Sequence, residues 1–192
     1  MPIASERGYR VTARGSSSRI PTDGVFAAGD ANGDGFDDIL VRDFGLILGG
    51  TDPLSSDVPT LDDLPEARVR RFEGFDYGSG PEGQVVFYPI GDVDDDRRAD
   101  FLVNGSLIDG FGPAYLLLDA FATPDPLTLG NLRAQPGVPV VFPGGAVSGA
   151  EGLGDVDGDG IDDFALPGAR FDAGSFDSES VGVLVYGSRG FR

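Results

Sequence analysis

Three segments of the chain repeat one pattern, and this repetition constrains the fold more than any other feature. Each begins with Gly-Asp, continues through an acidic loop and ends in a short apolar run, at residues 29–41, 91–103 and 154–166. Their first aspartates, Asp30, Asp92 and Asp155, lie 62 and 63 residues apart. A period of this length is typical of arrays and propellers. We therefore predict one module over residues 1–192 with three repeats, approximately 7–66, 67–133 and 134–192.

The spacing of side-chain oxygens in each loop predicts a metal site. If the first aspartate is position 1, carboxylate or amide oxygens recur at positions 1, 3, 5 and 9, and the carbonyl at position 7 can join them. Calcium takes about six to eight oxygen ligands in such loops, whereas magnesium demands a stricter octahedron. Zinc and copper are disfavoured because the loops lack His and Cys. We predict about three calcium ions per chain, bound by Asp30, Asn32, Asp34, Phe36 and Asp38; by Asp92, Asp94, Asp96, Arg98 and Asp100; and by Asp155, Asp157, Asp159, Ile161 and Asp163.

An EF-hand loop opens in the same way, but the end of these loops excludes it. An EF-hand needs a glutamate at position 12 and a following helix. Position 12 is Val41, Val103 or Leu166, and the apolar runs that end there are typical of buried strands. Each loop is therefore predicted to join two strands. A solvated acidic turn would explain one such loop, but three loops in phase favour metal binding.

The loops and their flanks resemble the FG-GAP repeat family, the calcium-loop repeats of integrin alpha-subunit propellers and of many bacterial surface proteins. The likeness extends to the small-residue segments before two of the loops, residues 25–28 and 150–153, and to two later hairpin segments, residues 114–118 and 181–187. It also includes Pro167-Gly-Ala169. The resemblance implies an all-β fold of four-stranded propeller blades. It also implies calcium-dependent binding or adhesion outside the cell, at the cell surface or in the periplasm.

Two departures from the family pattern lead to local predictions. Arg97 stands at position 6 of the second loop, where the other loops have Gly35 and Gly160. A positive φ at this position costs a residue with a Cβ about 1 kcal/mol or more, so the second site is expected to bind calcium most weakly, although Asp95 adds a further acid. In the first repeat, residues 41–49 leave little room between two strands, which predicts a tight hairpin.

Composition supports an all-β protein and narrows its partners. The chain has 31 glycines and 14 prolines, which disfavour long helices. Its formal net charge of −18 argues against binding to nucleic acid phosphates. There are no cysteines, no apolar run long enough to span a membrane and no apolar leader in the first residues. Calcium could stabilise the fold in place of disulfides.

Catalysis is not expected. The chain has no histidine, so Ser-His and His-ligated metal chemistry are excluded. Paired carboxylates could still hydrolyse glycosides, and Glu82 or Glu151 could serve if either lay in a cleft beside a second carboxylate. The aspartates at position 8, Asp37 and Asp162, are expected to face solvent.

Three blades are fewer than the roughly four to eight that close a propeller. Arg7-Gly-Tyr-Arg10 recurs near the other end as Arg189-Gly-Phe-Arg192, which suggests that two chains pair end to end. A fragment of a longer propeller and an unusual small closure remain alternatives. The predicted function is a non-catalytic binding or adhesion module for a protein or glycan ligand. The alternatives are an accessory polysaccharide-binding module of a secreted enzyme and a purely structural, self-assembling propeller fragment.

The remaining segments are predicted from their place between the repeats. Residues 51–65 are expected to connect the first blade to the second, and residues 119–139 the second blade to the third. Arg68, Arg70 and Arg71 are expected to lie on an outer strand and to pair with nearby acids.

Overall fold

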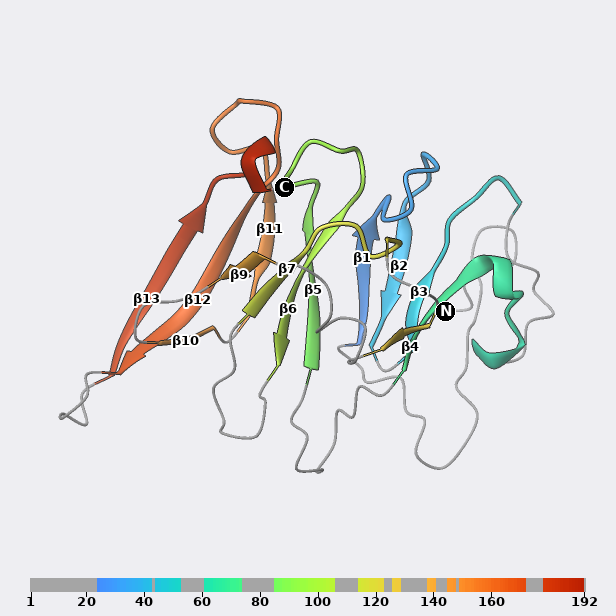
Figure 1. Cartoon of the computed structure of the whole chain (residues 1–192), viewed down its shortest axis with the longest axis horizontal. Helices are drawn as coiled ribbons and strands as arrows, with labels where there is room; N and C mark the ends of the chain where they lie inside the picture. The colour runs from blue at the N-terminus through green and yellow to red at the C-terminus, as the bar shows by residue number, and fades with distance from the viewer. Residues whose placement is uncertain are drawn as a thin grey trace, which may run out of the picture.

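The computed structural model describes residues 24–42, 44–52, 61–73, 85–105, 114–122, 126–128, 138–140, 145–147, 149–171 and 178–191. Within these ranges the chain forms β-strands and short 3-10 helices. The strands make three sheets that lie side by side in chain order (Figure 1). The all-β prediction is confirmed. Among the described residues, no helix is long and apolar enough to cross a membrane.

Sheet 1 contains β1 (Val25–Gly29), β2 (Asp38–Val41), β3 (Gly45–Ile47) and β4 (Val69–Glu73) as antiparallel neighbours. A two-residue strand, β8 (Leu127–Thr128), extends it parallel to β4. The tight hairpin predicted for residues 41–49 is confirmed, because β2 pairs with β3 and the N–H of Phe44 donates to the carbonyl of Val41 at 3.1 Å.

Sheet 2 is antiparallel throughout and contains β5 (Val85–Gly91), β6 (Asp100–Gly105), β7 (Ala114–Leu117) and β9 (Val138–Val140). In sheet 3, β10 (Gly145–Val147) and β11 (Glu151–Gly154) pair with successive parts of one edge of β12 (Asp163–Phe171). The opposite edge of β12 pairs with β13 (Ser178–Val185). The 3-10 helices are η1 (Leu61–Asp63), η2 (Glu66–Arg68) and η3 (Arg189–Phe191).

The hairpin that carries each acidic loop has the same irregular register in all three sheets. Gly29 pairs with Asp38, Gly91 with Asp100 and Gly154 with Asp163, and the residue before each glycine is skipped as a bulge. All three glycines have positive φ, between 65° and 88°. This geometry explains why Gly-Asp opens every copy, since only glycine adopts it at little cost.

The long connections lie within sheets rather than between them. Residues 51–65 lead from β3 to β4 of sheet 1, and residues 119–139 lead from β7 to β9 of sheet 2 while placing β8 on sheet 1. Both were predicted to join neighbouring blades, and this assignment was wrong. The loops define the period, but the fourth strand of a sheet has no motif, so only strand pairing shows where it belongs. As a result, β4 belongs to sheet 1 although it lies beyond residue 66.

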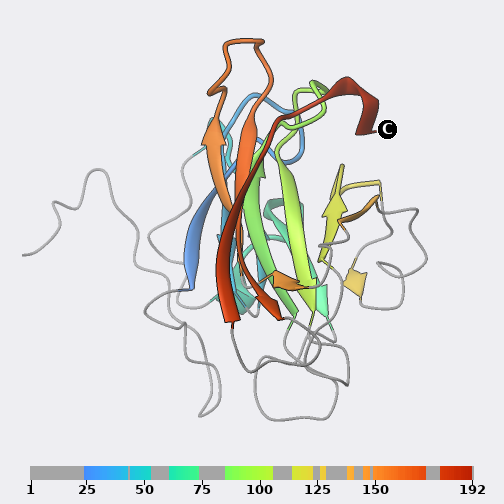
Figure 2. The ribbon, with the colours of Figure 1, turned by 90° about the vertical axis from the view of Figure 1, so that its left-hand side faces the viewer.

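Apolar layers hold neighbouring sheets together. The layer between sheets 1 and 2 includes Leu40 and Leu46 on one side and Phe87 and Phe101 on the other. The layer between sheets 2 and 3 is built from Ile90, Val93, Leu102, Ala114, Leu116, Phe164 and Leu166. Figure 2, in which sheet 3 faces the viewer, shows sheets 2 and 1 behind it. Both faces of sheet 2 are therefore covered, so the exposure of residues on the two outer sheets can be compared with that of the equivalent residues in sheet 2.

Candidate metal centres

The three acidic loops lie along one edge of the molecule, at the top of Figure 1. Loop 1 (residues 30–38) joins β1 to β2, loop 2 (92–100) joins β5 to β6, and loop 3 (155–163) joins β11 to β12. The prediction that each loop joins two strands is confirmed.

The aspartate at position 1 organises each loop. Asp30 Oδ1 accepts the N–H groups of Gly33 and Asp34 at 2.8 and 3.0 Å, and Oδ2 accepts that of Gly35 at 2.7 Å. Asp155 binds positions 4, 5 and 6 of loop 3 in the same way, and Asp92 binds positions 5 and 6 of loop 2. A short acidic side chain that caps nearby N–H groups in this way stabilises a tight turn.

Positions 3 and 5 continue this pattern of local hydrogen bonds. Asn32 Oδ1 accepts the N–H of Asp34 at 2.9 Å, and Asp34 Oδ1 accepts the N–H of Phe36 at 2.9 Å. Asp157 and Asp159 make the equivalent contacts in loop 3, and Asp96 Oδ1 accepts the N–H of Arg98 in loop 2. The repeated side chains thus form repeated local structure, which the spacing alone predicted.

The aspartate at position 9 has a second role that the sequence did not reveal. Asp38, Asp100 and Asp163 are at most 1% exposed. Asp163 Oδ2 accepts the N–H of Val156 at 2.8 Å, and its Oδ1 accepts that of Gly187, just beyond β13, at 2.9 Å. Asp38 bridges Ala31 and Gly49 in the same manner. Asp38 and Asp163 therefore anchor their loops to the chain just beyond β3 and β13, whether or not a metal binds.

Asp100 differs from its two counterparts because one of its oxygens lacks a hydrogen bond of normal geometry. Its Oδ2 accepts the N–H of Val93 at 2.9 Å, but its buried Oδ1 has no such partner, and the nearby N–H of Asp119 lowers the pKa only weakly. Burial, helped by the nearby carboxylates of Asp94 and Asp96, raises the pKa of Asp100 to about 8. Burial also raises the pKa of Asp38. A cation near such a carboxylate would favour its ionised form.

Two groups of predicted ligands converge in the structure. One oxygen each from Asp92, Asp94 and Asp100 lie within 4.8 Å of one another, and so do oxygens of Asp155, Asp157 and Asp159. Calcium–oxygen distances of about 2.3–2.6 Å place two ligands of one ion up to about 5 Å apart, so this spacing fits. Loop 1 has Asn32 at position 3, and the Asn32 amide donates to Asp34 Oδ2 at 3.0 Å. The donors present, all oxygen and mostly charged, suit calcium.

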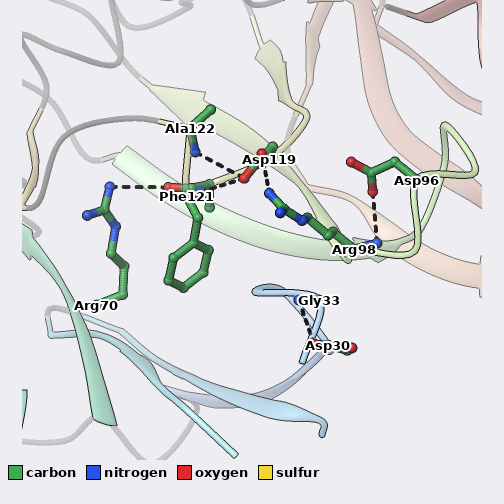
Figure 3. A network of polar contacts seen from close by, with 9 residues as sticks. Asp30, Gly33, Arg70, Asp96, Arg98, Asp119, Phe121 and Ala122 are labelled. Atoms are coloured by element: carbon green, nitrogen blue, oxygen red, sulfur yellow. Dashed lines mark hydrogen bonds and ion pairs between the residues drawn. The ribbon is translucent and has the colours of Figure 1, made fainter. Parts of the chain in front are cut away.

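Arg98, at position 7 of loop 2, lies beside the preceding loop. Arg98 extends over Gly33 of loop 1 and forms an ion pair with Asp119 (Figure 3). Asp119 also accepts the N–H groups of Phe121 and Ala122 at 2.8 and 3.0 Å. Sequence reasoning missed Asp119, whose only signal was an acid directly after a predicted strand. This network holds loop 2 against the segment after β7 and keeps the Arg98 side chain over loop 1.

Arg70 and Arg71 lie on β4, as expected of strand residues, whereas Arg68 ends the 3-10 helix η2 instead of lying on a strand. Backbone carbonyls and aromatic rings are among the partners of these arginines. Arg70 is only 5% exposed, donates to the carbonyl of Ala120 at 3.3 Å and lies over the Phe121 ring. Arg68 donates to the carbonyls of Leu48 and Asp52. Arg70 therefore joins sheet 1 to the segment after β7, and Arg68 holds the segment after β3 within sheet 1.

Neighbouring loops are joined by hydrogen bonds of constant register. The N–H at position 8 of one loop donates to the carbonyl at position 1 of the preceding loop, as Ala99 does to Asp30 at 2.8 Å and Asp162 to Asp92 at 3.1 Å. The Asp162 carboxylate also accepts the N–H of Asp92 at 3.0 Å. The expectation that Asp162 faces solvent was wrong, because sheet 2 presents a backbone donor to it. Asp37, at the same position in loop 1, is exposed as expected.

Loop 2 adopts the backbone conformation of the glycine-containing loops without their glycines. Arg97 has φ 71° and Asp95 has φ 62°, at positions where loop 1 has Gly35 and Gly33. The positive φ predicted for Arg97 is confirmed. We expect Arg97→Gly to raise the free energy of unfolding in chelator by about 1 kcal/mol, because the left-handed conformation costs a residue with a Cβ about that much. Urea unfolding measures the change.

Asp95→Gly provides the comparison for this prediction. Asp95 tolerates positive φ better than arginine, and its Oδ2 accepts the Nε–H of Arg189 at 2.6 Å. We therefore expect a smaller gain or none. An Arg97→Gly variant no more stable than Asp95→Gly would contradict the strain assigned to Arg97.

A groove of about 680 Å³ runs along the strands that lead into the three acidic loops, β1, β5 and β11. Glu151 is exposed there, and among the described residues that line the groove it is the one carboxylate. The paired carboxylates that glycoside hydrolysis requires are therefore not assembled by these residues. Glu82, the other candidate, lies outside the described residues.

Comparison with protein families, curated proteins and solved structures finds no match to this chain.

Proposed function

We propose that this protein is a calcium-binding β-propeller module of the FG-GAP type that serves extracellular binding or adhesion and is not catalytic. The observation that carries the proposal is the convergence of carboxylates in loop 2, where Asp92, Asp94 and Asp100 share a site and Asp100 has a buried oxygen without a normal hydrogen bond. Three loops of one construction on one edge support the same reading for loops 1 and 3.

Electrostatics favours an ion in these loops. A buried carboxylate close to other carboxylates is costly unless a cation or a proton compensates it. The formal charge of −18 adds to the repulsion, and three calcium ions would reduce it only to −12. In each filled site, the residues at positions 1, 3, 5 and 9 would hold the ion through side-chain oxygens and the residue at position 7 through its carbonyl. The ion would neutralise the loop and fix its position.

The proposed location agrees with the strength expected of such sites. Extracellular calcium modules bind with dissociation constants of about 10⁻⁴ to 10⁻³ M, so they fill where calcium is millimolar. The ligand is proposed to be a protein or a glycan. The groove along β1, β5 and β11 is one surface to test, through exposed Glu151.

Calcium titration tests the proposal directly. We expect about three ions per chain by calorimetry, with loop 2 the weakest because of Arg97. At tenfold excess over the dissociation constant, each site adds about 1.4 kcal/mol to stability. Three sites together should raise the melting temperature by roughly 10 °C over the protein in chelator. No heat of binding together with an unchanged melting temperature would refute the proposal.

Two variants distinguish calcium binding at a specific site from calcium attraction by the overall acidic charge. Asp159→Ala should reduce the stoichiometry from three to two, because Asp159 belongs to the loop 3 group and is exposed enough to be replaced without disturbing the core. Asp52→Ala removes the same charge from an exposed position outside the loops and should leave three sites. Equal behaviour of the two variants would indicate diffuse screening instead of a built site.

A further inference from the structure

The two ends of the row of sheets expose large apolar side chains. On the outer face of sheet 1, Val25 is 57% exposed, Phe36 39% and Ile39 42%. On the outer face of sheet 3, Leu153 is 42% exposed, Val156 52%, Leu184 45% and Tyr186 52%. We call these sets the head face and the tail face. Among the described residues they are all of the large exposed apolar side chains.

Five of these positions, Val25, Ile39, Leu153, Val156 and Leu184, align with buried residues in the other sheets. The shared loop register aligns Val25 and Ile39 with Phe87 and Phe101 of sheet 2, which are 3% and 0% exposed against sheet 1. In sheet 3, Phe164 is the counterpart of Ile39 and is 0% exposed against sheet 2. The head face therefore has the pattern that packs on a preceding sheet in sheets 2 and 3.

The tail face has the pattern that packs against a following sheet in sheets 1 and 2. Leu153, Val156 and Leu184 align with Ile90, Val93 and Leu116 of sheet 2, which are 0%, 0% and 2% exposed beneath sheet 3. They also align with Ala28, Ala31 and Leu46 of sheet 1, which are at most 1% exposed. The two exposed faces are thus the two halves of an interface that the chain forms twice internally.

The connection after β3 covers part of the outer face of sheet 1, beside the head face. Leu61 and Leu64 pack with Val41 and Ile47 of sheet 1. In sheet 2 the corresponding connection brings Leu127 into the cluster with Val103 and Leu117, and sheet 1 still packs against the rest. The same division in sheet 1 leaves the part near loop 1 available to a preceding sheet.

Asp37 is placed to make the polar contacts that join neighbouring sheets inside the chain. At position 8 of loop 3, Asp162 accepts the N–H of Asp92 at 3.0 Å and returns its own N–H to the carbonyl of Asp92 at 3.1 Å. Loop 2 has Ala99 at this position, which makes only the second contact. Loop 1 has Asp37, exposed beside the head face, so it presents the same carboxylate and N–H as Asp162. The equivalent acceptor and donor on the tail side belong to Asp155.

We propose that copies of this chain assemble head to tail, with the head face of one copy packed on the tail face of another and Asp37 bound to the backbone of Asp155. The occupant of each face is a second copy, because the chain contains both halves of its own internal interface. Two copies joined at both ends would place six sheets in a ring, within the roughly four to eight of closed propellers. This inference uses the stacking of the sheets and does not depend on the proposed calcium function.

The predicted pairing through the echo between Arg7–Arg10 and Arg189–Arg192 stays a prediction. Residues 7–10 lie outside the described residues, and Arg189–Phe191 forms a 3-10 helix. The N–H of Ser188, just before it, donates to the carbonyl of Val93 at 2.8 Å, which joins sheet 3 to loop 2 within the chain.

Light scattering of the full chain in saturating calcium tests the assembly. The wild type should show about twice the 20.0 kDa chain mass at micromolar concentration. Ile39→Asp on the head face and Leu184→Asp on the tail face should each weaken association at least about 30-fold, the effect typical of a residue at the centre of an interface. Both positions are exposed in the single chain, so both variants should fold. Thr51→Asp, at an exposed position outside both faces, is the matched control.

Mixing the two variants shows the direction of the contact. Ile39→Asp retains a good tail face and Leu184→Asp a good head face, so an equimolar mixture should recover pairs through one intact joint. Asp37→Ala should weaken association of the wild type by a smaller factor. A wild type that stays at single-chain mass at 100 µM, or a variant with one altered face that pairs with itself as well as the wild type does, would overturn the proposal. Calorimetry on the same samples reports calcium binding separately, so either proposal can fail alone.

Discussion

Replacing Phe101 by alanine should lower the free energy of unfolding by about 3–5 kcal/mol, the usual cost of deleting a buried aromatic ring. Phe101 is fully buried in the apolar layer between sheets 1 and 2. Urea unfolding at submicromolar protein concentration measures the change without a contribution from assembly. A loss of this size would take much of the roughly 5–15 kcal/mol that stabilises a typical domain.

Ile39→Ala is the matched control, because Ile39 occupies the position of Phe101 in sheet 1 and is 42% exposed. We expect a loss of about 1 kcal/mol or less in the dissociated chain. If both substitutions proved equally damaging at low concentration, the head face would be covered in the single chain. If both proved mild, sheets 1 and 2 would not share the apolar layer described above.

Asp163→Ala should destabilise the protein by about 2–4 kcal/mol even in chelator. The substitution leaves the N–H groups of Val156 and Gly187 without their acceptor, and an unsatisfied buried donor costs about 1–3 kcal/mol. Asp163→Asn retains one acceptor oxygen and should lose about half as much. Thermal and urea unfolding, each with calcium and with chelator, separate this structural role from metal binding.

Asp159→Ala is the comparison for Asp163→Ala, since Asp159 lies in the same loop and is exposed. In chelator we expect little loss, because its removal relieves repulsion among the carboxylates of loop 3. In calcium it should lose the stabilisation that one bound ion provides. An Asp163→Ala variant that is destabilised only in calcium would show that position 9 acts through the metal alone.

The molecule is proposed to use two kinds of surface for binding. The loop edge would bind calcium and hold the strands in position, while the head and tail faces would bind other copies. These surfaces meet at position 8, where Asp37 lies directly beside the buried Asp38 of loop 1. Filling the loops would also reduce the repulsion between copies that each have a formal charge of −18. Assembly is therefore expected to be stronger in calcium than in chelator, while its direction is set by the apolar faces.

The sequence by itself determined the local structure of this protein. The loop register, the positive φ of Arg97 and the tight β2–β3 hairpin were all predicted and are present. The reason is that side-chain oxygens and backbone N–H groups only two to five residues apart form these loops, as the contacts of Asp30 show. Such contacts repeat whenever the residues repeat.

Only the tertiary structure decided which distant segments meet. The Asp162 carboxylate contacts a backbone 70 residues away, and Asp163 holds a strand end 24 residues away. The assignment of β4 to sheet 1 and the ion pair between Arg98 and Asp119 likewise depend on which strands pair within a sheet. These contacts between distant segments depend on which strands pair and on which apolar faces are buried against each other. The same burial leaves Ile39 exposed while it covers Phe101 and Phe164 at the equivalent positions.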